Sequence, residues 1–478
     1  MKQKVKLAII LGAEFLAIAI VLLLIFFSTK KQYTITFDLD GGTLISGSLV
    51  QSVTQGHNAT PPAAVKEGHY LRGWSGNYRG VTSDERVTAI WEYETTPGIE
   101  YSTKAGATYT EISGCFRSIS GKLYIGAYHN DLIVYGIKTG AFANCTRVTD
   151  IYLLDGIITI GERAFAGCSS LETIELPDTA TVIGDSAFEG CESLKTIVLP
   201  RALETLGDNA FIGCDSLETV YIPDTVTVIG ENAFLGCENL KKVIFYSEDE
   251  VDPNAPDDSE EDSDEDAEDG DIPEERVLPP LTIGGSAFAA CLRLEAVEFP
   301  NGLIRIEDSA FKGCLSLKLV TLGESLRYIG EEAFLGCVSL GVCDLTDNIT
   351  HIGRAAFKDC RALTRASIPA GVKTVEESLY SGCTSLVGVT VKSGTVTVRK
   401  GAFKGCSSLE YAVIPRSVTV IETEAFDSDT LTVYLERGSE EPQPAGYAPA
   451  WCHGETHFIF NYSGEEIVTD PKPEDITE

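Results

Sequence analysis

The sequence predicts a solenoid of stacked repeats, preceded by a small β domain and by an apolar N-terminal helix. The main observation is a cysteine that returns every 23 residues behind a Phe or Tyr, with one longer step in the middle. A period of roughly 20–50 residues is typical of stacked repeats, each of which packs only against its neighbours. The other two observations are an apolar run at residues 7–27 and, after it, a stretch that alternates with period two, as β-strands do. The cysteine ladder comprises Cys145, Cys168, Cys191, Cys214, Cys237, Cys291, Cys314, Cys337, Cys360, Cys383 and Cys406.

The apolar run at residues 7–27 is interrupted only by Glu14. A helix of this length, at ~1.5 Å per residue, spans about 30 Å, which is the thickness of a bilayer core. The lysines of residues 1–6 favour a cytoplasmic N-terminal tail, with the rest of the chain outside. The run is longer than the apolar part of a usual signal peptide, and no small-residue cleavage site follows it. We therefore expect a transmembrane signal-anchor, with secretion after signal cleavage as the alternative.

Residues 33–94 are expected to form a small β domain. Residues 33–37 alternate with period two and end at Asp40-Gly41-Gly42, which is a turn signal, and residues 87–91 form a closing strand. The stretch resembles the B-repeat of internalin-type bacterial surface proteins (the Listeria-Bacteroides repeat), although residues 75–85 are shorter than is usual. The resemblance implies a β-grasp-like spacer or weak binding unit. It rests on Phe37, Asp38, Asp40-Gly41-Gly42, Gly56, Ala59, Pro61-Pro62, Gly68, Tyr70, Gly73-Trp74 and Ala89-Ile90-Trp91.

A linker is expected at residues 95–112, followed by the solenoid at residues 113–435. Read from Cys168, one repeat is Cys-x-x-Leu-x-x-Ile-x-Leu-Pro-Asp-x-x-x-x-Ile-Gly-x-x-Ala-Phe-x-Gly-Cys. Leu171, Ile174 and Leu176 fit one strand that points into a core, so each repeat adds one strand to a parallel sheet on one face. The pattern resembles the BspA-like leucine-rich repeat. That family is associated with adhesion to host proteins and to other cells, which the resemblance implies here.

The longer step in the ladder is caused by an acidic block at residues 247–276, which we expect to be a disordered insertion. Residues 436–462 are expected to cap the last repeat, and residues 463–478 form an acidic tail. The formal net charge of −34 argues against a nucleic-acid partner, because phosphate binding needs clusters of Lys and Arg.

The ladder cysteines are expected to be buried thiols. Strands that stack at ~4.8 Å hold equivalent cysteines too far apart for the Cβ separation of a disulfide, so the thiols act as small apolar residues. Cys115 and Cys452 are off register, and whether they are free or form a disulfide is left open. No CxxC pair and no GxSxG, HExxH, GxGxxG or P-loop sequence occurs. The prediction is a protein without enzyme activity, metal or cofactor.

The outward side of the repeat strands is the best candidate ligand surface. Val198, Tyr221 and Ile244 fall in one column on successive repeats, which makes an apolar strip on a face that should contact water. Ordinary β-propensity on a sheet surface is an equally good explanation. The candidate ligand-binding residues are Val198, Tyr221, Ile244, Leu319, Val342, Tyr411 and Val413.

These expectations lead to a membrane-anchored extracellular recognition protein. We expect an adhesin that binds host or neighbouring-cell proteins or glycans through the solenoid, with the B-repeat as a stalk. The alternative is a non-catalytic structural or assembly protein of the cell envelope with no external ligand.

Overall fold

The computed structural model describes residues 31–463 apart from residues 56, 67–68, 77, 80, 94, 248–277, 429–430 and 454–455. The chain divides into two compact units, Met1–Thr95 and Thr96–Glu478. Within the described residues every regular element is a β-strand, so none of them forms a helix that could span a bilayer. The predicted cytoplasmic tail at residues 1–6, the membrane segment at 7–27, and all but one residue of both the acidic insertion and the tail lie outside the described residues.

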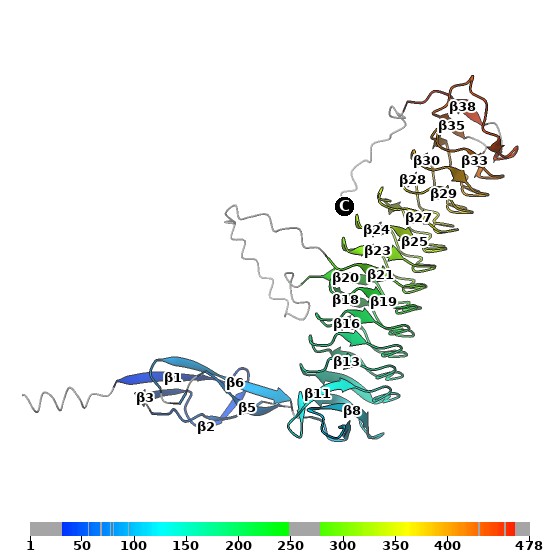
Figure 1. Ribbon diagram of the computed structural model, residues 1–478. Coiled ribbons are helices and arrows are strands. Elements are labelled where there is room, and N and C mark those ends of the chain that lie inside the picture. Colours follow the sequence, from blue (N-terminus) through cyan, green and yellow to red (C-terminus); the bar gives the residue numbers. More distant parts are fainter. Residues whose placement is uncertain are drawn as a thin grey trace, which may run out of the picture. The chain divides into compact units, whose positions relative to one another are not determined.

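The first unit contains a mixed four-stranded sheet in the order β3-β1-β6-β5, with a separate β2-β4 pair, within its described residues (Figure 1). Strand β1 runs parallel to β6 and antiparallel to β3. Ile35 and Phe37 alternate with less buried neighbours and point into a core that also holds Val53 and Val87. The strands are β1 (Gln32–Asp38), β2 (Thr43–Ser46), β3 (Val50–Thr54), β4 (Ala63–Val65), β5 (His69–Ser75) and β6 (Glu85–Tyr93).

The predicted turn after β1 has a steric basis. Asp40 and Gly41 both adopt left-handed backbone angles, with φ of 45° and 75°. A Cβ atom at Gly42 would overlap the ring of Trp91, whose Nε1 donates a hydrogen bond of 2.7 Å to the Leu39 carbonyl oxygen. The Asp-Gly-Gly sequence therefore allows both the turn and the close approach of the indole ring.

The second unit is a solenoid whose coils stack into an elongated, gently curved body (Figure 1). One strand of each coil contributes to a parallel sheet, here called the first sheet, which is hydrogen-bonded in three sections that meet between β14 and β16 and between β26 and β28. Its strands are β9 (Gly121–Ile125), β12 (Val148–Leu153), β14 (Thr173–Glu175), β16 (Thr196–Val198), β18 (Thr219–Pro223), β20 (Lys242–Tyr246), β22 (Ala296–Glu298), β24 (Leu319–Thr321), β26 (Val342–Cys343), β28 (Arg365–Ile368), β30 (Gly388–Val391), β32 (Tyr411–Ile414), β35 (Thr432–Leu435) and β38 (His457–Ile459).

A second parallel sheet lines the opposite wall, so the prediction of a sheet on one face was incomplete. Most coils give this sheet only two residues, such as Val182–Ile183, which is too short for an alternating pattern to be seen in the sequence. Its strands are β8 (Tyr109–Cys115), β11 (Leu132–Ile137), β13 (Thr159–Ile160), β15 (Val182–Ile183), β17 (Thr205–Leu206), β19 (Val228–Ile229), β21 (Leu281–Ile283), β23 (Leu303–Ile306), β25 (Tyr328–Ile329), β27 (His351–Ile352), β29 (Thr374–Val375), β31 (Thr397–Val398), β33 (Val420–Ile421) and β36 (Gly446–Tyr447).

The ends of the solenoid carry extra strands. Residues 95–112, expected to be a linker, instead contain β7 (Ile99–Ser102), which pairs antiparallel with β8 and begins the second sheet. A short β10 (Tyr128–His129) pairs with β11. At the other end, β34 (Phe426–Asp427) pairs with β37 (Cys452–His453), and Trp451 packs edge-on against Phe426 with ring centroids 5.9 Å apart. Trp451 therefore covers the last ring of the interior.

The interior is a continuous column of stacked rings beside the cysteine ladder. From Phe142 to Phe426 the ring planes lie within 14° of parallel, and successive centroids are 4.9–5.7 Å apart. The ladder thiols from Cys168 to Cys406 are buried, as predicted. Each donates a hydrogen bond of 3.1–3.4 Å to the carbonyl oxygen of the ring residue one coil earlier. The thiols thus pack as apolar groups and also link neighbouring coils.

Glycine occurs at two corners of the repeated coil, for a different structural reason at each corner. Gly190, which precedes a ladder cysteine, has a φ of 70°, a left-handed angle that costs glycine nothing. Gly184 serves a different purpose, because a Cβ atom there would lie 2.7 Å from the backbone nitrogen of Glu162 in the preceding coil. The corner glycine after the second-sheet strand therefore sets how closely two coils stack.

Candidate ligand-binding face

The register of the first sheet places three of the predicted residues side by side. Val198 pairs with Tyr221, and Tyr221 pairs with Ile244, on consecutive strands β16, β18 and β20. All three are half-buried, and they lie in the outward position between the buried residues of each strand. The predicted apolar strip is therefore present as one contiguous column of side chains.

Two tyrosines extend this column and were not found from the sequence. Tyr124 on β9 and Tyr152 on β12 occupy the same outward position, and their rings stack with centroids 4.9 Å apart and an angle of 10°. The alternation of Leu123-Tyr124-Ile125 was a signal for this position. It was missed because the first coils are irregular, with 28 residues separating the two tyrosines instead of 23. We call Tyr124, Tyr152, Val198, Tyr221 and Ile244 the apolar column.

Glu175 stands between the two parts of the apolar column. It pairs in register with Tyr152, and within the described residues its carboxylate makes no hydrogen bond or ion pair. Partial removal of water raises the pKa of this carboxyl above its usual value. A carboxylate acceptor that has no partner in the described part of the chain is therefore placed beside the tyrosine pair.

A hollow of about 550 Å³ opens next to Glu175, where the hydrogen-bond ladder of the first sheet is interrupted between β14 and β16. Its polar lining includes Asp155, Asp178 and Thr196, and Val198 of the apolar column borders it. At the other side of the tyrosine pair, the Lys122 ammonium lies 6.0 Å from the centre of the Tyr152 ring. The face thus combines flat rings, an apolar strip and hydrogen-bonding acceptors within neighbouring coils.

The other predicted residues do not join this column. Leu319 and Val342 pair with each other in a parallel column nearer the start of each strand, and they are exposed at 43% and 49%. Tyr411 lies in that same column toward the C-terminal end, where its ring fills the space that a Cβ atom at Gly388 would occupy. The seven residues therefore form separate groups on one face.

Val413 is a correction, because it was expected to be exposed and is buried. It pairs in register with Tyr434 on β35, and the Tyr434 ring packs edge-on against Tyr462 with centroids 5.3 Å apart. A hollow of about 390 Å³ near it is lined by Val413 and Tyr462 together. The C-terminal cap thus covers the outward position of the strands at this end.

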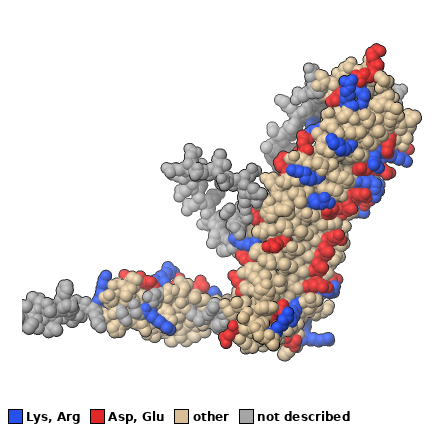
Figure 2. All heavy atoms as spheres, in the orientation of Figure 1, with Lys and Arg blue, Asp and Glu red and all other residues tan. Residues whose placement is uncertain are grey.

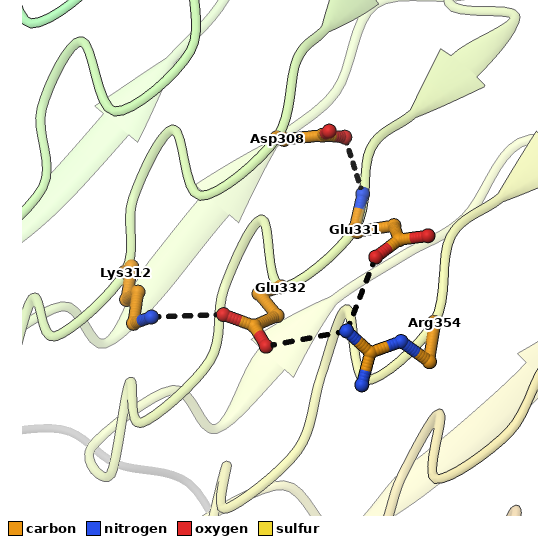
Figure 3. A network of polar contacts seen from close by, with 5 residues as sticks. All are labelled: Asp308, Lys312, Glu331, Glu332 and Arg354. Carbon is orange, nitrogen blue, oxygen red and sulfur yellow. Dashed lines mark hydrogen bonds and ion pairs between the residues drawn. The ribbon is translucent and has the colours of Figure 1, made fainter.

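Acidic side chains gather along the edge of the solenoid beyond β19, β21 and β25 (Figure 2). Their polar atoms are partly used within the fold (Figure 3). The Asp308 carboxylate accepts a 2.7 Å hydrogen bond from the backbone N–H of Glu331 in the next coil. Glu332 accepts from Lys312 at 2.8 Å, and this hydrogen bond lowers the pKa of its carboxyl, while Arg354 contacts both glutamates. This edge therefore contributes contacts between coils.

In the described part of the chain, no group of three or more His, Cys, Asp or Glu side chains is arranged to hold a metal ion.

Comparison with known families identifies the repeats. The family model for the BspA type leucine-rich repeat region matches residues 135–255 and 281–407, which is just over half of the chain. The chain belongs to the BspA-type leucine-rich repeat family. The matched residues contain the whole apolar column except Tyr124, and they leave out the first unit and the C-terminal cap.

Solved structures with leucine-rich repeats are also similar. A leucine-rich repeat protein from Bacteroides ovatus ATCC 8483 is 24% identical, covering 68% of this chain and 95% of that chain, with a TM-score of 0.38. The T. pallidum leucine-rich repeat protein TpLRR is 26% identical over 52% of this chain and 91% of its own, with a TM-score of 0.36. A leucine-rich cell surface protein from Faecalibacterium prausnitzii A2-165 is 21% identical over 73% and 95%, with a TM-score of 0.33. None of the curated protein sequences matches this chain.

Proposed function

We propose that this protein is a surface-displayed recognition protein that binds a protein or glycan ligand through the apolar column of the first sheet. The observation that carries the proposal is the run of Tyr124, Tyr152, Val198, Tyr221 and Ile244 in one outward position. Aromatic side chains on a water-facing surface are favoured at binding sites, because they bury much area and lose little rotamer entropy.

The polar groups around the column define the chemistry of the ligand. Glu175 offers acceptor atoms without a partner among the described residues, and Asp155 and Asp178 border the same hollow. A ligand that meets these groups must carry N–H or O–H donors, as the lysine and arginine side chains of a protein or the hydroxyls of a glycan do. Its apolar parts would lie on the stacked tyrosine rings, which suit both a sugar face and an aliphatic side chain.

Display on the outside of the cell is part of the proposal. The apolar run at residues 7–27 has the length of a transmembrane segment and follows a lysine-rich tail, so it would hold the chain in the membrane with the solenoid outside. The first unit would then be a spacer of the B-repeat type. Membership of the BspA-type family is consistent with a place on the cell surface.

A binding assay with a matched pair of variants tests the proposal. The full chain in detergent is applied to arrays of matrix proteins and glycans, beside Tyr221→Glu and Tyr328→Glu. Tyr328 is also half-buried and lies on the outward side of the second sheet, so it makes the same chemical change on the other face. We expect Tyr221→Glu to weaken binding about 30-fold or more, as loss of a central aromatic contact does, and Tyr328→Glu to bind as the parent does.

Three outcomes contradict the proposal. If Tyr328→Glu loses binding and Tyr221→Glu keeps it, the ligand uses the other face. If both variants bind as the parent does, the apolar column is a structural surface. If the parent binds no protein or glycan on the arrays, the alternative of an envelope protein without an external ligand replaces the proposal. Circular dichroism of each variant shows whether a loss reflects binding or folding.

A further inference from the structure

Two cysteine sulfur atoms face each other at the N-terminal end of the solenoid. Cys115 is the last residue of β8, and Cys145 belongs to the first coil that has the Phe-Cys pattern. Their Sγ atoms are 2.9 Å apart. Non-bonded carbon atoms prefer separations of about 3.5–4.0 Å, and sulfur is the larger atom, so these two sulfur atoms are closer than an ordinary non-bonded contact. A disulfide bond needs a sulfur–sulfur distance of about 2.05 Å, so a small movement of the two side chains would close the remaining gap.

The position of Cys145 differs from every later position of the ladder. From Cys168 onward each thiol is buried and donates to a carbonyl oxygen of the preceding coil, as described above. Cys145 is the first member, and in place of that carbonyl it has the thiol of Cys115. Both cysteines are half-buried and line a surface hollow of about 600 Å³. An oxidant from solvent can therefore reach this pair, whereas the ladder interior is closed to it.

We propose that Cys115 and Cys145 are a redox pair that forms a disulfide bond when the protein meets a disulfide oxidant outside the cell. The thiolate of Cys145 attacks one sulfur of the oxidant, an S–S bond to Cys145 forms, and one thiolate of the oxidant leaves. The sulfur of Cys115, having lost its proton to that leaving thiolate, then attacks Cys145 and releases the second thiolate. Two protein thiols become one disulfide, and one oxidant disulfide becomes two thiols.

The two thiols share one hydrogen bond, in which either sulfur can be the donor. This contact lowers the pKa of Cys145 and raises the pKa of Cys115. The thiolate is the nucleophile in thiol–disulfide exchange, which favours Cys145 for the first attack, and the same disulfide forms if Cys115 attacks first.

The bond would fasten the N-terminal hairpin to the repeats. Strands β7 and β8 begin the second sheet, and the bond closes a loop that contains β9, β10 and β11. Capping segments of a solenoid contact a neighbour on one side only, and a covalent link at this end opposes fraying. The inference does not depend on ligand binding.

Peptide mapping of the full chain tests the pair directly. The reduced chain in detergent is equilibrated with oxidised glutathione, denatured with iodoacetamide present, and digested with trypsin. Cleavage after lysine and arginine places Cys115 in the peptide of residues 105–117 and Cys145 in that of residues 139–147. We expect these two peptides to be joined, to separate on reduction, and to differ in mass by two hydrogens from the sum of the free peptides.

Serine variants provide the controls. Cys115→Ser should leave peptide 139–147 alkylated or carrying glutathione, and Cys452→Ser, which removes another half-buried cysteine, should leave the linked peptides unchanged. The proposal is overturned if the parent yields both peptides separately and alkylated after oxidation. It is equally overturned if either cysteine is recovered joined to a different cysteine of the chain.

Discussion

Phe211 offers a sharp test of the stacked interior. Its ring is completely buried between Phe188 and Phe234, with centroid separations of 4.9 Å and 5.1 Å. Replacing a buried Phe by Ala costs about 3–5 kcal/mol of unfolding free energy through lost burial and the cavity left behind. Because Phe211→Ala also removes two stacked ring pairs, each worth about 0.5–1.5 kcal/mol, we expect a cost near the upper end, about 5 kcal/mol.

The position of a ring in the stack should change how much unfolding free energy is lost when that residue is replaced by Ala. Phe142 is the first ring and has a stacked neighbour only on the Phe165 side, at 5.2 Å. Phe142→Ala therefore loses one ring pair, and we expect about 3 kcal/mol. Leu315 is 46% exposed, so Leu315→Ala is the surface control and should change stability by no more than about 0.5 kcal/mol.

Urea unfolding of the full chain, followed by circular dichroism, measures these costs. A solenoid coil contacts only its neighbours, so a central cavity should also divide the transition of Phe211→Ala into two steps, whereas Phe142→Ala should keep one. The reasoning is refuted if Phe211→Ala unfolds at the same urea concentration as Leu315→Ala, or if Phe142→Ala is the more damaging of the two ring variants.

Two further predictions concern charge. Burial raises the pKa of the Cys168, Cys237 and Cys406 thiols from 9.0 to about 12. Above pH 9 the folded state therefore keeps protons that the unfolded state has lost. Each thiol should lower the free energy of unfolding by about 1.4 kcal/mol per pH unit from pH 9 to 12. Urea midpoints at pH 8 and pH 11 measure this loss, and Cys168→Ala should reduce its slope; equal midpoints would contradict it. Glu332→Gln breaks contacts with Lys312 and Arg354 that are partly open to solvent. It should lower the free energy of unfolding by less than about 1 kcal/mol, and by less again in 1 M salt. A larger or salt-independent loss in urea unfolding would show that Glu332 does more than form a surface ion pair.

The sequence predicted the features that recur with the period. Cys, Phe and Leu at fixed spacing can all be buried only if each repeat occupies one coil, so the solenoid, its buried ladder and the outward column of Val198, Tyr221 and Ile244 followed from spacing alone. The second sheet could not be predicted in the same way. Two residues per coil, such as Val182–Ile183, show no alternation, and their pairing is visible only when coils are stacked.

The features that were missed lie where the repeat is irregular. Residues 95–112 lack the repeat pattern and were expected to be a linker, yet they hold β7 and the first part of β8, a hairpin that extends the second sheet. Tyr124 and Tyr152 are separated by 28 residues, which hid their common position. Val413 fits the outward pattern, yet it is buried, because its neighbour Tyr434 on β35 packs against Tyr462 of the cap. In each case a contact between segments distant in sequence decided the outcome.

Cysteine has two different roles along this chain, and its position in the stack decides which role it has. A ladder thiol such as Cys214 is enclosed, keeps its proton because burial raises its pKa, and donates a hydrogen bond to the Phe188 carbonyl oxygen. It therefore lacks the thiolate, the access and the sulfur partner that oxidation requires. Cys145 has the same place in the repeat, but no Phe-Cys coil precedes it, and the hairpin brings Cys115 to its sulfur instead. In our proposal, the place of Cys145 at the end of the solenoid makes it reactive, so a disulfide oxidant would join the first coil to the N-terminal hairpin while the ladder stays reduced.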